Sequence, residues 1–131
     1  MENIKLSKMK EFIDEYLGIP YIRYGRDKRG IDCIGLVIKW MEKEGIKLPD
    51  FSNAIDDNSE DFKKWFHISS KNYIKVDDYT TGDIVIIIQD GKQHAGIVID
   101  KSRFIHASIK HGVIVSYIYL FKEIYGYFRK I

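Results

Sequence analysis

The chain has 131 residues, and this length predicts one domain spanning residues 1–131. Its composition, with 45% hydrophobic and 31% charged residues, is typical of a globular protein. Its 21 lysines and arginines nearly balance 19 aspartates and glutamates, so a net charge of +2 gives no reason to expect nucleic acid or an anionic membrane as a partner. The single cysteine, Cys33, excludes an intramolecular disulfide and a zinc site made of cysteines alone.

The chain begins with the periodicity of a helix. Apolar residues three or four positions apart predict an amphipathic helix over residues 4–17, which ends at Gly18 and Pro20. Acidic residues are scattered through this segment, which lacks the uninterrupted apolar core of a secretory signal. The longest apolar run, residues 84–88, is too short to cross a bilayer. We therefore expect no signal peptide, no transmembrane segment and a cytoplasmic protein.

Two further helices are predicted in the first half. Residues 21–32 form a charged loop with two glycines, and the apolar spacing after it predicts a helix over residues 33–44, ended by Gly45. A short third helix is predicted over residues 57–68, after an acidic stretch. The candidates for its N-cap are Asp57, Asn58 and Ser59.

The second half of the chain changes to the pattern of strands. Short apolar runs rich in β-branched and aromatic residues alternate with turn residues. The predicted strands lie in "TTGDIVIII" (80–88), "HAGIVID" (94–100), "RFIHAS" (103–108), "GVIVSYIYL" (112–120) and "IYGYFRKI" (124–131). Helices followed by an antiparallel meander predict an α+β domain, with the N-terminal helices packed on one face of a central antiparallel sheet.

Cys33 stands at the predicted start of the second helix. One interpretation is a small, buried hydrophobic residue. The other is a nucleophile, because the unpaired N–H groups and the dipole of a helix start stabilise an anion. Lowering a thiol pKa from ~8.5 to the ~4 of catalytic cysteines requires about 6 kcal/mol, and a helix terminus supplies at most ~2 kcal/mol. A nucleophilic Cys33 therefore requires a nearby cation, for which imidazolium is the usual choice.

The histidines differ in their surroundings. His67 and His111 lie in segments typical of the surface, whereas His94 and His106 lie in short apolar strands beside small residues that leave room around the ring. Side chains alternate across a strand, so these two share a face only in one register. A two-residue loop at Lys101–Ser102 places them on opposite faces. A three-residue loop or a bulge places them on the same face.

Six segments, in this order, resemble the NlpC family of papain-like cysteine endopeptidases, which cut peptidoglycan stem peptides. The resemblance covers most of the chain and implies a papain-like, NlpC-type single domain. Each segment alone is a weak signal, and the six together are a strong one. The segments are "GIPYIRYG", "GIDCIGLV", "GIKLP", "TTGDIVII", "HAGIVID" and "FIHAS".

The resemblance implies a role for five residues. Cys33 would be the nucleophile, His94 the base that forms a thiolate–imidazolium pair, and His106 the group that orients the imidazole. Tyr21 and Asp32 would line the substrate cleft, and Asp32 would receive a free amino group of a stem peptide. The backbone N–H of Cys33 would stabilise the oxyanion, and acyl transfer would proceed through a thioester without a cofactor or a metal.

One residue departs from the family pattern. Ile34 follows the cysteine where the family commonly has serine, which removes a hydroxyl from the edge of the expected cleft and leaves the substrate open. A large apolar residue here is closer to the short, phage-associated branch of the family. This similarity implies association with a virion and phage tail proteins as partners.

Three alternatives remain open from the sequence. The first is a catalytically silent binding or tail-assembly protein of the same fold. The second is a papain-like amidase or acyltransferase that acts on a lipid or a protein. The third is a zinc site formed by Cys33, His94 and His106, with Asp32 as the obvious fourth ligand.

Overall fold

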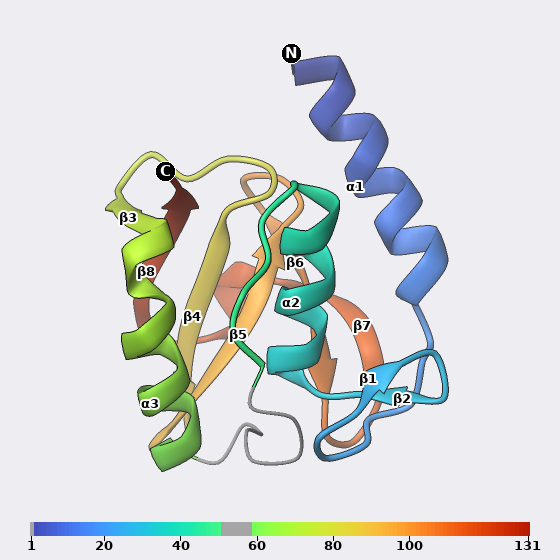
Figure 1. The fold of residues 1–131 in the computed structure, drawn as a ribbon, viewed down its shortest axis with the longest axis vertical. Helices are drawn as coiled ribbons and strands as arrows, with labels where there is room; N and C mark the ends of the chain where they lie inside the picture. The colour runs from blue at the N-terminus through green and yellow to red at the C-terminus, as the bar shows by residue number, and fades with distance from the viewer. Residues whose placement is uncertain (1, 51–58) are drawn as a thin grey trace.

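The computed structural model describes residues 2–50 and 59–131, which form helices packed against a six-stranded sheet (Figure 1). Figure 1 shows α2 and α3 on the same face of this sheet, with α1 beside α2. The helices are α1 (Glu2–Tyr16), α2 (Cys33–Lys43) and α3 (Ser59–Ser69).

The helix predictions agree with the structure to within a few residues. The helices expected over residues 4–17 and 33–44 are confirmed as α1 and α2. The helix expected over residues 57–68 is α3. Its candidate caps Asp57 and Asn58 lie outside the described residues. No helix within the described part of the chain is long and apolar enough to cross a membrane.

The main sheet is antiparallel throughout and has the order β3-β8-β4-β5-β6-β7. The four central elements of the prediction, β4 to β7, form the expected meander. The prediction of a simple meander is wrong for the last strand, because β8 returns to lie between β3 and β4. The strands are β3 (Tyr73–Val76), β4 (Ile84–Gln89), β5 (Lys92–Val98), β6 (Arg103–Ser108), β7 (Gly112–Tyr117) and β8 (Ile124–Lys130).

The sequence pattern missed a short hairpin, an edge strand and the 3₁₀ turns, of which η2 (Ser70–Asn72) follows α3 directly. A two-stranded hairpin, β1 (Arg26–Asp27) and β2 (Gly30–Ile31), lies within the predicted loop, and the edge strand β3 follows α3. The 3₁₀ turn η3 (Ile118–Leu120) ends the predicted strand 112–120 early. Among the described strands β3 pairs with β8, which lies at the far end of the chain. A local sequence pattern therefore could not predict the partner of β3.

The turn between β4 and β5 fixes the start of β5. Gln89 pairs with Lys92, which leaves a two-residue loop of Asp90 and Gly91, both with positive φ (53° and 75°). This loop has the backbone of a type I′ turn, which matches the twist of a tight hairpin. The turn sets the pairing of Ile87 with His94, and so decides which face of the sheet His94 takes.

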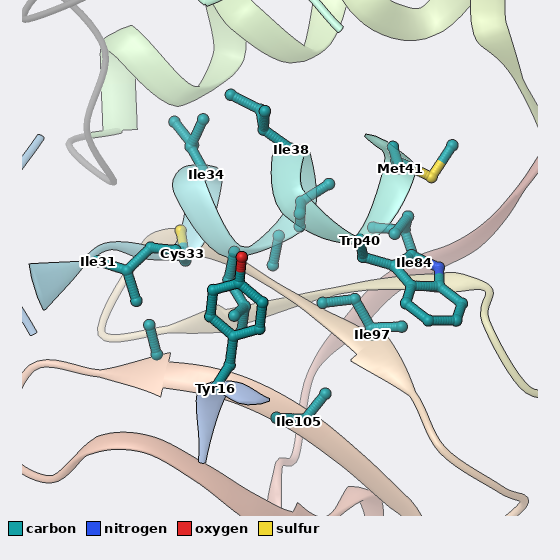
Figure 2. Close-up of a cluster of buried hydrophobic side chains, with 14 of the residues drawn as sticks. Tyr16, Ile31, Cys33, Ile34, Ile38, Trp40, Met41, Ile84, Ile97 and Ile105 are labelled. Atoms are coloured by element: carbon teal, nitrogen blue, oxygen red, sulfur yellow. The ribbon is translucent and has the colours of Figure 1, made fainter. Parts of the chain in front are cut away.

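Alternation along the strands divides the apolar core in two. The main cluster fills the space between the helices and the sheet, and Figure 2 shows side chains of α2 lying over the strand residues Ile97 and Ile105. The smaller cluster lies on the other face of the sheet, beneath the C-terminal part of the chain. Its buried members are Val85, Ile87, Val98, Phe104 and Ile118.

Candidate active site

Cys33 is the first residue of α2, as the sequence predicts, and its side chain is fully buried (Figure 2). Asp32 is the N-cap: its backbone is extended, and its carboxylate accepts a hydrogen bond from the Gly35 N–H at 2.8 Å. This is the standard way of satisfying one of the unpaired N–H groups at a helix start. The thiol therefore lies in the first turn, where the helix dipole favours an anion.

The carboxylate of Asp32 is hydrogen-bonded to several groups of its own chain. Besides Gly35, it accepts hydrogen bonds from the Arg26 guanidinium at 2.7 Å and from the Tyr24 N–H at 3.0 Å. Asp32 is fully buried, with 0% of its surface exposed. A buried carboxylate has to be paired and hydrogen-bonded, and this one is bound by groups of its own chain. Asp32 thus joins the loop before α2 to the start of that helix.

The same loop lies directly against the first turn of α2. A Cβ at Gly35 would lie 2.4 Å from the carbonyl oxygen of Gly25, so only glycine allows this approach. Tyr21 forms an isolated bridge to Ile31, two residues before Cys33, and is half-buried against the main core. The structure thus places Tyr21 near the backbone that leads into the thiol.

The register question for the two histidines is answered by a three-residue loop. The Ile99 N–H donates to the Arg103 carbonyl, which leaves residues 100–102 as the loop, and Gly96 pairs with His106. His94 and Gly96 are two apart on β5, so both histidines share one face. His94 Nε2 lies 2.9 Å from His106 Nδ1. The predicted pairing of the two imidazoles is present.

The loop that sets this register is stabilised by its own aspartate. The Asp100 carboxylate accepts hydrogen bonds from the Ser102 and Arg103 N–H groups and from the Arg103 guanidinium. These hydrogen bonds lower the pKa of Asp100 although its burial acts in the opposite direction. An aspartate that closes a turn in this way is typical of loops that reverse direction in three residues.

His106 is enclosed by aromatic rings. It stacks on Phe104 at a centroid distance of 4.5 Å and meets the edge of Phe121 at 5.8 Å. His106 is 4% exposed, and its Nε2 lies 2.8 Å from Ser116 Oγ. Burial, and secondarily the charge of His94, lowers the pKa of His106 to about 3. His106 is therefore neutral at any pH near 7, so of this pair His94 is the ring that can carry the charge.

We expect the neutral His106 to make the protein less stable in acid. Histidine in the unfolded chain has a pKa of 6.5, against about 3 in the folded protein. Between pH 3 and pH 6.5 the unfolded state binds more protons than the folded state does. The contribution of His106 to the free energy of unfolding is therefore fully present above pH 6.5 and is lost as the pH falls toward 3. The contribution of this residue is about 2 kcal/mol between pH 8 and pH 5. Urea denaturation at the two pH values measures it.

The control for that experiment is His106→Gln, which does not titrate. The variant should lose less of its free energy of unfolding between the two pH values, by that same amount. Equal losses in the two proteins would contradict the burial of a neutral imidazole.

Cys33 comes from α2, whereas the two imidazoles come from the neighbouring strands β5 and β6. Cys33 belongs to the main core cluster, together with Ala95 and Ala107, which directly follow the two histidines in sequence. By alternation His94 and His106 share a face of the sheet with Phe104, on which the ring of His106 stacks. His94 is the third residue of β5, close to the beginning of this strand.

A depression of about 490 Å³ lies beside the imidazole pair. His94, His106 and Ser116 contribute to its wall, and the β4–β5 and β6–β7 turns form its rim. His94 is only half-buried, so its ring is accessible where His106 is not. His111 is exposed on this rim, and His67 is exposed on α3, as the sequence predicts for both.

Two other expectations can be compared with the described residues. Ile34 is fully buried in the main core, and in Figure 2 it points away from the strands, so its side chain is part of the packing and not of an exposed cleft edge. Residues 2–50 and 59–131 contain no cluster of three histidine, cysteine, aspartate or glutamate side chains arranged to hold a metal ion. The alternative of a zinc site at Cys33, His94 and His106 therefore has no ligand cluster there.

Two groups that the structure places at the site were not predicted from the sequence. Ser116 contacts His106 from β7, and Arg26 forms an ion pair with Asp32. A serine within the apolar strand "GVIVSYIYL" is a weak signal for the first. Arg26 lies in a dense charged loop, where the pattern offers no reason to choose it over its neighbours.

Comparison with known proteins gives consistent results. A probable endopeptidase of Haemophilus influenzae is 28% identical over 119 residues, which cover 85% of this chain and 64% of that protein. The murein DD-endopeptidase/LD-carboxypeptidase MepS of Escherichia coli K12 is 32% identical over 116 residues, covering 87% of this chain and 55% of that protein. This chain thus spans between about half and two thirds of the length of these two relatives.

Solved structures and a family model complete the comparison. An NlpC/P60 family protein from Bacillus cereus has the same fold, with a TM-score of 0.71 at 22% identity over 95% of this chain and 40% of that one. The model of the NlpC/P60 family matches residues 18–126, which include every segment on which the resemblance was based. Since this match extends over most of its length, the chain belongs to the NlpC/P60 family.

Proposed function

We propose that this chain is a cysteine peptidase domain that hydrolyses peptide bonds in peptidoglycan stem peptides through a thioester intermediate. The family is one of cysteine peptidases that act on peptidoglycan, and two of its relatives are named as endopeptidases, one of them of murein. The observations that carry the proposal are the contact of 2.9 Å between His94 Nε2 and His106 Nδ1 and the position of a lone cysteine at the start of α2.

In this proposal His94 is the base. Its Nε2 faces His106, so Nδ1 is the atom assigned to the Cys33 thiol. Proton transfer from sulfur to Nδ1 gives a thiolate and an imidazolium, and the neutral His106 accepts the Nε2–H of that imidazolium. Two adjacent imidazolium rings would repel each other, so the burial that keeps His106 neutral also favours the charge on His94.

The reaction then follows from these roles. The thiolate attacks the scissile carbonyl, and the negative charge on oxygen is stabilised by the backbone N–H of Cys33 at the start of α2. His94 gives its proton to the leaving nitrogen, the C–N bond breaks and a thioester forms. Water, deprotonated by His94, hydrolyses the thioester and restores the thiol. Tyr21 is proposed to contact the substrate, and Asp32 to hold the loop and helix that carry Tyr21 and Cys33.

The test is digestion of defined peptidoglycan fragments. Wild-type protein is expected to produce a fragment with a new free amino group, identified by mass spectrometry of muropeptides before and after incubation. Cys33→Ala should form no such product, while His67→Ala, a change of an exposed histidine on α3, should form it as fast as the wild type. The proposal fails if the folded wild-type protein cuts none of the fragments, or if Cys33→Ala cuts them equally well.

A finer proposal concerns where this hydrolase acts. We propose that it works with phage tail proteins in a virion, on the ground that Ile34 resembles the residue found in the phage-associated branch. Proteomic analysis of purified phage-like particles from the host strain is expected to detect the chain. Its presence in the cytosolic fraction alone would contradict this assignment without affecting the hydrolase proposal.

A further inference from the structure

The contact between the two histidines continues to a third polar group. His94 Nε2 lies 2.9 Å from His106 Nδ1, and His106 Nε2 lies 2.8 Å from Ser116 Oγ. These are normal hydrogen-bond distances, and the three side chains come from β5, β6 and β7. Three neighbouring strands of one sheet thus place an uninterrupted series of hydrogen bonds on one face.

The direction of the protons in this series can be worked out from the charge that the mechanism needs. If His94 becomes an imidazolium, both of its nitrogens carry protons, and the Nε2–H must donate. His106 Nδ1 must then accept, so it carries no proton. A neutral imidazole has one N–H, which in His106 must be on Nε2. The Nε2–H donates to Ser116 Oγ, the acceptor that lies within hydrogen-bond distance.

We infer that Ser116 is a positioning residue: its hydroxyl accepts a hydrogen bond from His106 Nε2–H and so keeps the Nδ1 lone pair of His106 directed at His94. This inference rests on the proposed function of His94 as the base. In the other tautomer, a proton on His106 Nδ1 would face His94 Nε2, and that nitrogen would have to be unprotonated. The imidazolium could not form without a rearrangement of the rings.

The surroundings explain why this choice depends on Ser116. His106 is held between Phe104 and Phe121, so its ring cannot turn easily to find another partner. Ser116 pairs with Phe104 across the β6–β7 ladder, which places it diagonally next to His106. Without the hydroxyl, the Nε2–H would be buried among aromatic carbons, and the proton would be more stable on Nδ1, where His94 accepts it. The lowered pKa of His106 agrees with a ring that is held neutral.

The experiment compares Ser116→Thr with Ser116→Val, which have nearly the same shape and favour strands, but of which only threonine carries a hydroxyl. Imidazole ¹⁵N chemical shifts in the full chain report which nitrogen of His106 carries the proton. We expect the proton on Nε2 in the wild type and in Ser116→Thr, and a shift toward Nδ1 in Ser116→Val. Hydrolysis should show a kcat lowered roughly 10- to 100-fold in Ser116→Val, with KM unchanged and partial recovery in Ser116→Thr.

A serine without this contact provides the control. Ser108 lines the same depression and accepts a hydrogen bond only from the His111 backbone N–H among those described, so Ser108→Ala should behave as the wild type. The inference is overturned if His106 keeps its proton on Nε2 in Ser116→Val, or if the proton moves and kcat does not change. If the wild type hydrolyses no substrate, the proposed function fails, and the ¹⁵N shifts still decide whether Ser116 sets the tautomer.

Discussion

His94→Ala is expected to reduce the rate of stem-peptide hydrolysis by about 10⁴-fold or more, the loss typical for removal of one member of a catalytic set that acts as a unit. The physical reason is that without the imidazole no group takes the thiol proton and none protonates the leaving nitrogen. His94 is only half-buried, so the variant should keep its fold and unfold within a few degrees of the wild type. Hydrolysis rates and thermal unfolding measure the two effects separately.

Alkylation of Cys33 tests the same pair without any substrate. At pH 5.5 an ordinary thiol is only about 0.1% thiolate, so rapid reaction with iodoacetamide at this pH reports a stabilised thiolate. We expect rapid alkylation in the wild type and in His111→Ala, a change of an exposed histidine on the rim of the same depression. We expect this rapid alkylation to be lost in His94→Ala. Equal and slow alkylation of all three proteins would leave Cys33 as a buried core thiol, and the catalytically silent alternative would then be favoured.

Asp32→Ala is expected to destabilise the folded protein by about 3–5 kcal/mol. The substitution removes the N-cap of α2, leaves the Tyr24 and Gly35 N–H groups without this acceptor, and removes the carboxylate beside the Arg26 guanidinium. Removing the buried partner of an ion pair costs more than the pair contributes as a whole, although Asp50 still pairs with the Arg26 guanidinium at 3.1 Å. Urea denaturation at pH 7 measures the loss.

Two further variants separate the effects of Asp32. Asp32→Asn keeps Oδ1 for the Gly35 cap and should cost less than Asp32→Ala, although its amide nitrogen cannot accept the hydrogen bond of the Tyr24 N–H. Arg26→Gln combined with Asp32→Ala should cost less than the sum of the single changes, since each removes the same contact. Strictly additive losses, or a loss below about 1 kcal/mol in Asp32→Ala, would show that the carboxylate behaves as an ordinary surface group.

Cys33, His94 and Asp32 could be picked out from the sequence, but their surroundings in the fold could not. The position of Cys33 at a helix start follows from local signals: an acidic cap, an apolar spacing of three and four, and a glycine at the end. Helix formation depends on residues within one or two turns, so a local pattern is sufficient to predict it. The same holds for the strand pattern of the second half and for the α+β class.

The relation between elements required the tertiary structure. His94 and His106 share a face because the loop between β5 and β6 has three residues and not two. The hydrogen bonds of Asp100 stabilise the loop of this length. The place of β8 between β3 and β4, the ion pair that buries Asp32, and the contact of Ser116 with His106 could not be inferred from local patterns.

The sequence by itself thus determined the class of the fold, the positions of most helices and strands, and the residue types that can carry the chemistry. Only the tertiary structure decided which of these side chains meet, which are buried and which proton arrangement the imidazole pair takes. The physical reason is one of range. Periodicity and capping depend on neighbours in the chain, whereas strand order, burial and hydrogen-bond partners depend on residues brought together from distant positions, whose pairing is settled by packing of the whole domain.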